Sequence, residues 1–133
     1  MSEENVELVR RAIDAYNRRD LDGLFENWAP DAVVDWSNSH GLDARVFRGR
    51  EEIRPFARRF LETFDEGRIE VLDVVEVDAG VVVVDNVTFF RGRDDIEVQA
   101  RAAWLIVIEN GVQMSLTLYQ TKEEALEAAG LRE

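Results

Sequence analysis

The stretch AWLIVIENGVQMSLTLY (residues 103–119) decides the fold of this chain. Two apolar runs flank the dipeptide Asn110-Gly111, which is the strongest short sequence signal for a tight hairpin turn. Both runs are rich in β-branched, aliphatic and aromatic side chains, which are typical of strands. The stretch therefore predicts two long antiparallel strands joined by a two-residue turn.

The same period of two continues upstream of this hairpin. Four long strands are expected, at residues 68–77, 81–91, 96–108 and 112–119. The turn signals between them are Asp78-Ala79-Gly80 and the segment 92–95. Together these segments predict an antiparallel meander that fills the second half of the chain.

The first half of the chain shows helical spacing instead. Apolar residues recur on one face from Val6 to Tyr16, so an amphipathic helix is expected over residues 3–19. Asp20 can cap a second, shorter helix that buries Trp28, with Pro30 at its end. A short strand is expected at residues 32–36, followed by a polar loop to residue 49.

A third helix has the clearest helical pattern in the sequence. Its continuous apolar face consists of Ile53, Phe56, Ala57, Phe60, Leu61 and Phe64. We expect Pro55 in its first turn, where the missing N–H costs little, and Gly67 at its end. A last short helix is expected to open with a capping box at Thr121–Glu124 and to end at Gly130.

This order of elements predicts an α+β fold with helices packed on one face of a curved antiparallel sheet. The 133 residues fit one domain that spans residues 1–133, since a chain of this length can bury a sizeable core. No internal repeat or linker interrupts it.

Composition excludes several classes of protein. The net charge is −12 and the basic residues are scattered, so binding to nucleic acid or to an anionic membrane is disfavoured. The absence of cysteine excludes disulfides and thiolate chemistry. The start MSEEN lacks the apolar core of a signal peptide, and the apolar runs are too short to span a bilayer. We therefore expect a cytoplasmic protein.

Five segments spread along the chain carry a resemblance to a known family. They are ELVRRAIDAYNRRDLDGL, PDAVVDW, FRGREEIRPF, ENG and LYQTKEEALEAAGL. In this order and spacing they resemble the SnoaL-like branch of the nuclear transport factor 2-like superfamily, which is related to polyketide cyclases and ketosteroid isomerases. The resemblance implies a cone: a highly curved antiparallel sheet with three N-terminal helices closing a pocket and a short C-terminal helix. It also implies a homodimer through the convex face of the sheet.

The resemblance further implies where catalytic groups would lie. In the isomerase pattern a carboxylate takes a proton next to a carbonyl while donors stabilise the oxyanion. The general base would fall on Trp36 and the second acid on Trp104. The oxyanion tyrosine would fall near Ala12, one turn from Tyr16, and a cyclase-like acid near Leu118. These positions carry the wrong chemistry, so the isomerase mechanism cannot be transferred to this chain.

The same positions describe an aromatic pocket. Alternation on the last strand puts Met114, Leu116 and Leu118 on one face and Gln113 on the other. The predicted ligand-binding residues are Trp28, Trp36, Phe56, Phe60, Trp104, Met114, Leu116 and Leu118. The alternative is that these side chains simply fill the core.

Polar candidates for catalysis are few. Asp85 interrupts an apolar strand, and it either faces inward as an acid or base or pairs with Arg101 on the outer face. Asp35 lies beside Trp36, either at the pocket or in solvent. His40 follows the first strand, near the expected pocket entrance, and is otherwise an exposed loop histidine. Tyr16 completes the set as a donor.

Three functions stay open on these residues. The first is binding of a small, mostly apolar molecule in an aromatic-lined cavity. The second is isomerase- or cyclase-like proton transfer by displaced catalytic residues, and the third is a non-catalytic dimerisation module.

One histidine with Asp35 and Asp43 lacks the spacing of a known metal ligand set, and no phosphate-binding glycine loop is present, so no metal or cofactor is expected.

Overall fold

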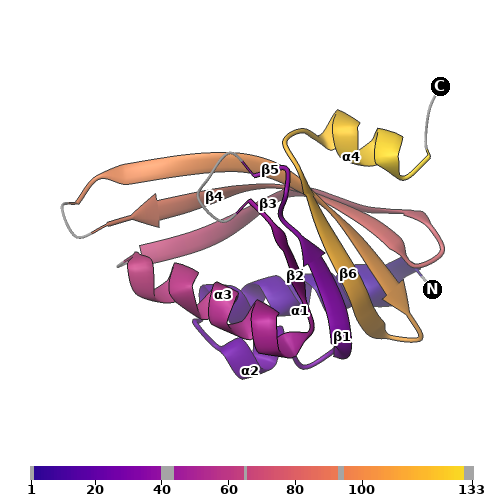
Figure 1. The fold of residues 1–133 in the computed structure, drawn as a ribbon. Coiled ribbons are helices and arrows are strands. Elements are labelled where there is room, and N and C mark those ends of the chain that lie inside the picture. The colour runs from indigo at the N-terminus through magenta and orange to yellow at the C-terminus, as the bar shows by residue number, and fades with distance from the viewer. Residues whose placement is uncertain (1, 40–43, 65, 93–94, 131–133) are drawn as a thin grey trace.

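The computed structural model describes residues 2–39, 44–64, 66–92 and 95–130. The helices are α1 (Ser2–Asn17), α2 (Leu21–Leu24), α3 (Arg50–Thr63) and α4 (Lys122–Ala128). The strands are β1 (Trp28–Asp35), β2 (Val46–Arg48), β3 (Glu66–Asp78), β4 (Val81–Arg91), β5 (Glu97–Glu109) and β6 (Val112–Tyr119). The α+β architecture expected from the sequence is confirmed (Figure 1).

The six strands form one curved, unclosed sheet in the order β2-β1-β6-β5-β4-β3. All neighbours run antiparallel except β1 and β6, which are parallel. Figure 1 shows α1, α2 and α3 together below the sheet and α4 alone above it. We call these the concave and the convex face of the sheet.

The predicted hairpin forms as expected. Asn110 and Gly111 have φ angles of 52° and 76°, the left-handed values that a type I′ turn requires at both central positions. β5 and β6 pair from Glu109↔Val112 outward, and the predicted bounds of β4 and β6 are those of the structure. The turn chemistry and the period of two were therefore sufficient to predict the presence and order of the strands in this half of the chain.

The segment before residue 32 was predicted wrongly. Trp28 and Pro30 lie in β1 and not in a helix, because α2 ends at Leu24. Trp28 pairs in register with Gln113 of β6, and the register shifts before the next pair, at Val33. Pro30 lies in this irregular part, where its missing N–H removes no regular ladder bond.

Helix α3 differs from its prediction at both ends. It begins at Arg50, so Pro55 lies in its second turn, and it ends at Thr63, so Gly67 belongs to β3. Its apolar face packs toward the concave side of the sheet, with Ile53, Phe56 and Leu61 buried. None of the described helices is both long and apolar enough to cross a membrane.

The two faces of the sheet carry two cores of unequal size. The main core fills the space between the concave face and the three N-terminal helices, and the smaller one lies under α4 around Val83, Ala103 and Ala125. The predicted capping box of α4 is present, with Thr121 accepting from the Glu124 N–H and the Glu124 carboxylate accepting from the Thr121 N–H.

The last residue of α1 closes part of the sheet edge. β3 is the edge strand, and Ile69 pairs with Thr88 of β4 on its inner side. On its outer side the Asn17 side chain donates to the Ile69 carbonyl at 2.9 Å and accepts from its N–H at 2.8 Å. α1 is thereby fixed against the edge of the sheet.

Candidate functional site

A cavity of about 140 Å³ lies between the concave face and helices α1, α2 and α3. Its lining comes from every strand except β2. The lining residues are Val9, Ala12, Ile13, Tyr16, Leu24, Phe25, Trp28, Val34, Trp36, Ile53, Phe56, Ala57, Phe60, Ile69, Thr88, Phe90, Trp104, Ile106, Gln113 and Leu116. None of these described residues is acidic, basic or histidine, so the lining is apolar with a few neutral polar groups.

Aromatic rings hold one wall of the cavity in place. Trp36 meets Phe56 and Phe60 edge to face, with ring centroids 5.5 Å and 6.4 Å apart. Phe56 stacks on Phe47 at 4.1 Å, and Phe47 is fully buried. Such ring pairs are favourable beyond the area that they bury. The wall between β1, β2 and α3 is therefore closely packed and fixes the position of Trp36.

The structure brings most of the predicted ligand-binding residues together. Six of them line the cavity: Trp28, Trp36, Phe56, Phe60, Trp104 and Leu116. Met114 and Leu118 belong to the main core but do not line the cavity. All three tryptophans of the chain thus lie around one cavity, and their role in binding stays a prediction.

Gln113 is a lining residue that the sequence prediction placed on the wrong face. It is 2 % exposed and lines the cavity together with Leu116. The β5–β6 register shifts between Val107↔Ser115 and Ile108↔Gln113, so a bulge inserts Met114 and reverses the alternation. A strict period of two cannot reveal such a bulge, and only its amide among apolar neighbours marks Gln113 as unusual.

Three buried nitrogen atoms of the lining residues have no hydrogen-bond partner among the described residues. They are Nε1 of Trp28, Nε1 of Trp104 and Nε2 of Gln113. Trp28 and Gln113 are register partners on β1 and β6, and Trp104 lies on the next strand, β5. Buried donors are nearly always paired in proteins, so three unpaired ones around one cavity are exceptional.

Tyr16 supplies a further polar group to the cavity from α1. Burial raises the pKa of its hydroxyl to about 12, and the nearby Arg19 opposes this only in part. The phenol is therefore neutral at physiological pH and acts as a hydrogen-bond donor or acceptor, not as a proton-abstracting phenolate.

Asp85 lies on the convex face, away from the cavity. Its register partner on β5 is Ala103, which packs with Val83 under α4. The carboxylate accepts a hydrogen bond from the Arg101 guanidinium at 3.0 Å. Of the two interpretations open from the sequence, the structure has the outward one with the Arg101 pair.

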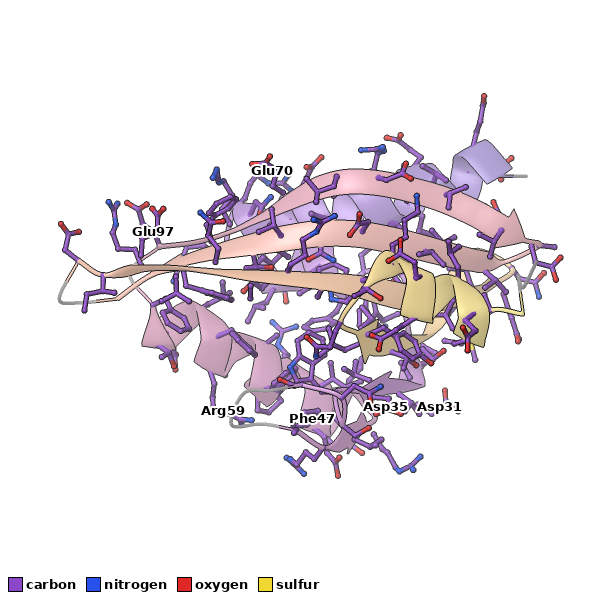
Figure 2. All side chains as sticks on the ribbon, turned by 90° about the horizontal axis from the view of Figure 1, so that it is seen from above. Asp31, Asp35, Phe47, Arg59, Glu70 and Glu97 are labelled. Atoms are coloured by element: carbon purple, nitrogen blue, oxygen red, sulfur yellow. The ribbon has the colours of Figure 1, made fainter. Side chains whose placement is uncertain are left out.

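Asp35 also points away from the cavity lining. It lies between Val34 and Trp36, which both line the cavity, and its carboxylate accepts from the Ser37 N–H and hydroxyl at 3.0 Å and 2.5 Å. Figure 2 shows it on the opposite side of the molecule from Glu70 of β3.

His40 lies outside the described residues. Among those described, no cluster of three or more His, Cys, Asp or Glu is placed to hold a metal ion.

Comparisons with known proteins agree with this fold. The family model described as SnoaL-like domain matches residues 9–113. None of the curated proteins compared with the chain matches it.

Solved structures share the fold at low sequence identity. An NTF2-like protein of unknown function from Burkholderia pseudomallei is 22% identical, with a TM-score of 0.75 over 93% of this chain and 95% of that one. Bal32a from a soil-derived mobile gene cassette is 22% identical, with a TM-score of 0.79 over 88% of each chain. RV0760c from Mycobacterium tuberculosis, in complex with estradiol-17beta-hemisuccinate, is 12% identical, with a TM-score of 0.75 over 90% of this chain and 94% of that one.

Proposed function

Because the chain belongs to the SnoaL-like domain family, whose fold alone does not set an activity, we propose that it binds a small, mostly apolar molecule in the cavity under the sheet. The observation that carries this proposal is a cavity of about 140 Å³ with aromatic walls and no charged group among its described lining residues. Cavities of this kind take up apolar ligands because the ligand leaves water and restores the missing contacts.

A structural neighbour supports small-molecule binding by this fold. RV0760c is described in complex with a steroid ester, estradiol-17beta-hemisuccinate. Its identity of 12% to the present chain makes it a precedent for the fold and not for the ligand.

The geometry favours binding over isomerase- or cyclase-like proton transfer. That chemistry requires a carboxylate or imidazole within hydrogen-bond reach of the substrate. Asp35 is hydrogen-bonded to Ser37, and Asp85 pairs with Arg101 on the other face of the sheet. His40 lies outside the described residues, and no acid or histidine is among the described residues that line the cavity.

Toluene provides a direct test, because it matches the apolar walls and carries no polar group. We expect saturating toluene to raise the melting temperature of the wild-type protein, since a ligand that binds only the folded state stabilises it. Ala57→Leu on α3 fills the cavity from a lining position, so it should abolish the shift. The matched control is Ala128→Leu, an exposed position on α4, which should keep the shift. No toluene shift in the wild type would contradict the proposal.

We further propose that the protein is a homodimer through the convex face. Val75 of β3 is 37% exposed and pairs in register with Val83, which packs under α4, so it lies on this face. Leu72, at the neighbouring bulge, is 46% exposed. Sedimentation should give a dimer for the wild type and a monomer for Val75→Glu, and a wild-type monomer would reject both this proposal and a dimerisation module. A cytoplasmic location stays a prediction from the sequence.

A further inference from the structure

The first part of β5 forms an open edge inside the sheet. β6 pairs with β5 only from Ala103↔Tyr119 onward, so residues 97–102 of β5 are paired with β4 alone. Within the described part of the chain, no second strand covers the other side of residues 97–102. Figure 1 shows this end of the β4–β5 hairpin extending away from β6 and α4. A strand edge of this kind can be extended by another strand.

On the concave side the open edge is apolar and uncovered. Val98 pairs in register with the cavity-lining Phe90, so Val98 and Ala100 lie on the concave side. Ile96, the residue before β5, continues this alternation. Ile96 and Val98 are 60% and 52% exposed, which is unusual for apolar side chains of this size. Both gain free energy when another surface covers them.

On the convex side the same edge is polar and carries both signs of charge. Arg101 pairs with Asp85 on this side, and alternation places Glu97 and Gln99 there as well. All three residues of β5 are exposed. The edge thus presents an acid and a base at equal distances on either side of an amide.

This edge is complementary to a second copy of itself in one antiparallel register. Residues directly opposite each other on antiparallel strands point to the same face of the sheet. When Gln99 faces Gln99 of the second copy, Glu97 faces Arg101 at both ends. Val98 then faces Ala100 on the concave side. Opposite charges meet twice and apolar side chains meet apolar side chains.

Neighbouring registers lose this match. A two-fold axis at Ala100 would place Glu97 opposite Ala103, whose outer side is already paired with Tyr119 of β6. An axis at Val98 would place Arg101 opposite Asp95, which lies outside the strand with a φ of 63°. The register centred on Gln99 therefore uses the open edge in full.

From this complementarity we propose that a second copy of the chain adds to the edge at residues 97–102, antiparallel and with Gln99 on the two-fold axis. The inference depends neither on the cavity nor on the dimer through the convex face. Stable interfaces bury about 800 Å² per partner, and one short strand pair buries less, so the Kd should be on the order of 0.1–1 mM. The pairing joins two sheets into one at high protein concentration.

Cysteine crosslinking tests the register, because the chain has no cysteine of its own. We use the Val75→Glu background, in which the dimer through the convex face is not expected. Gln99→Cys should form a disulfide-linked dimer under mild oxidation, since directly opposite residues have Cα atoms about 4.5–5.5 Å apart. The controls are Ala100→Cys, which is displaced diagonally from its counterpart, and Glu109→Cys at the other exposed end of β5. Both should crosslink roughly tenfold less.

Mixing two variants separates edge pairing from packing of two faces. Val98→Cys and Ala100→Cys face each other in the proposed register, so their mixture should give more mixed disulfide dimer than either variant gives alone. Both positions lie on the concave side, which contact through the convex face does not bring together. Absence of the mixed product, or equal crosslinking at Gln99, Ala100 and Glu109, would overturn the proposal.

Charge reversal tests the two ends of the pair by sedimentation equilibrium in the same background. Glu97→Arg sets two like charges against each other at both ends, so it should weaken self-association roughly five- to thirtyfold. Arg101→Glu should act likewise, and an equimolar mixture of the two variants should associate again. Glu109→Arg makes the same charge change outside the edge and should leave the Kd unaltered.

The outcomes keep this inference separate from the other proposals. If Arg101→Glu unfolds because it faces Asp85, Glu97→Arg and the cysteine variants still decide the question. A protein that stays monomeric in the Val75→Glu background at millimolar concentration, with no crosslink at Gln99, would show that a second copy is the wrong occupant. An extended segment of another protein would then be the remaining strand to test at this edge, and ligand binding in the cavity would be unaffected.

Discussion

The concave and convex faces of the sheet differ in how their polar side chains are paired. On the convex face Asp85 pairs with Arg101, and Asp73 pairs with Lys122 at 2.6 Å. On the concave side lie all the described residues with an unpaired buried side-chain atom: Trp28, Glu76, Asn86, Trp104 and Gln113. The polar groups named on the convex face are paired within the chain, whereas the buried atoms named on the concave side have no partner among the described residues.

Adjacent residues of one strand lie on opposite faces of the sheet. Trp104 lines the cavity, and its neighbour Ala103 packs under α4 on the other side of the sheet. Because the side-chain period is two, adjacent residues of β5 serve opposite faces. The concave side holds both the cavity and the main core, whereas the convex side holds a small core and ion pairs, so substitutions on the two faces should differ in kind and size.

Removal of a buried ring should have the largest effect. Phe47→Ala deletes a fully buried side chain that stacks on Phe56, so the free energy of unfolding should fall by about 3–5 kcal/mol. The matched convex variant is Phe89→Ala, whose half-buried ring lies under Arg68 at 4.5 Å and should cost roughly 1–2 kcal/mol. Urea denaturation measures both, and equal losses would contradict the difference in core size between the two faces.

Titration of Tyr16 should give the next largest effect. Its pKa is raised from 10.0 to about 12 by burial, so the folded state favours the neutral phenol. The resulting stability is fully present below pH 10 and is lost as the pH rises through 12, by at most about 2.7 kcal/mol. Tyr16→Phe should lack this contribution. We expect the stability difference between wild type and variant to change over this pH range in denaturant titrations, and a constant difference would rule out the raised pKa.

Loss of the cap of α4 should have a smaller effect, confined to the convex face. Thr121→Ala removes the capping box, so the free energy of unfolding should fall by about 1 kcal/mol. Toluene binding should be unchanged, since α4 does not line the cavity. Thr63→Ala at the end of α3, an exposed position, is the control with little expected loss. A changed toluene affinity in Thr121→Ala would show that the two faces are coupled.

The smallest effect is expected for the convex ion pair. The Arg101 side chain is 64% exposed, so solvent screens its attraction to Asp85. Arg101→Met should cost roughly 0.5–1 kcal/mol at low salt and less at high salt. Thermal denaturation at two salt concentrations measures this difference, and a salt-independent loss would indicate that packing and not charge stabilises the pair.

Sequence patterns predicted the strands and turns in the second half of the chain better than the site. β4, β6, the Asn110-Gly111 turn and the Thr121 cap follow from local signals that a short segment carries alone. The grouping of Trp28, Trp36 and Trp104 followed from family resemblance. Local sequence signals therefore predicted the secondary-structure elements, and the family resemblance predicted the residues of the cavity wall.

Features that depend on the pairing of residues far apart in the chain could not be predicted from the sequence. Trp28 continues the apolar pattern of a helix, and only its pairing with Gln113, far along the chain, makes it a strand residue. The bulge at Met114 turns Gln113 inward, and nothing in its own segment marks that shift. Whether a buried N–H finds a partner is likewise decided by the assembled fold, so the unpaired donors were beyond any pattern of residues.

The contact between Asn17 and Ile69 has a consequence for how molecules meet in solution. A carboxamide is the same chemical group as a peptide unit, and here it presents its N–H and its oxygen to the Ile69 backbone as a neighbouring strand would. Exposed edge strands invite other chains to add to the sheet and form aggregates. One side chain at the end of α1 thus imitates a seventh strand at this position and prevents the sheet from growing there.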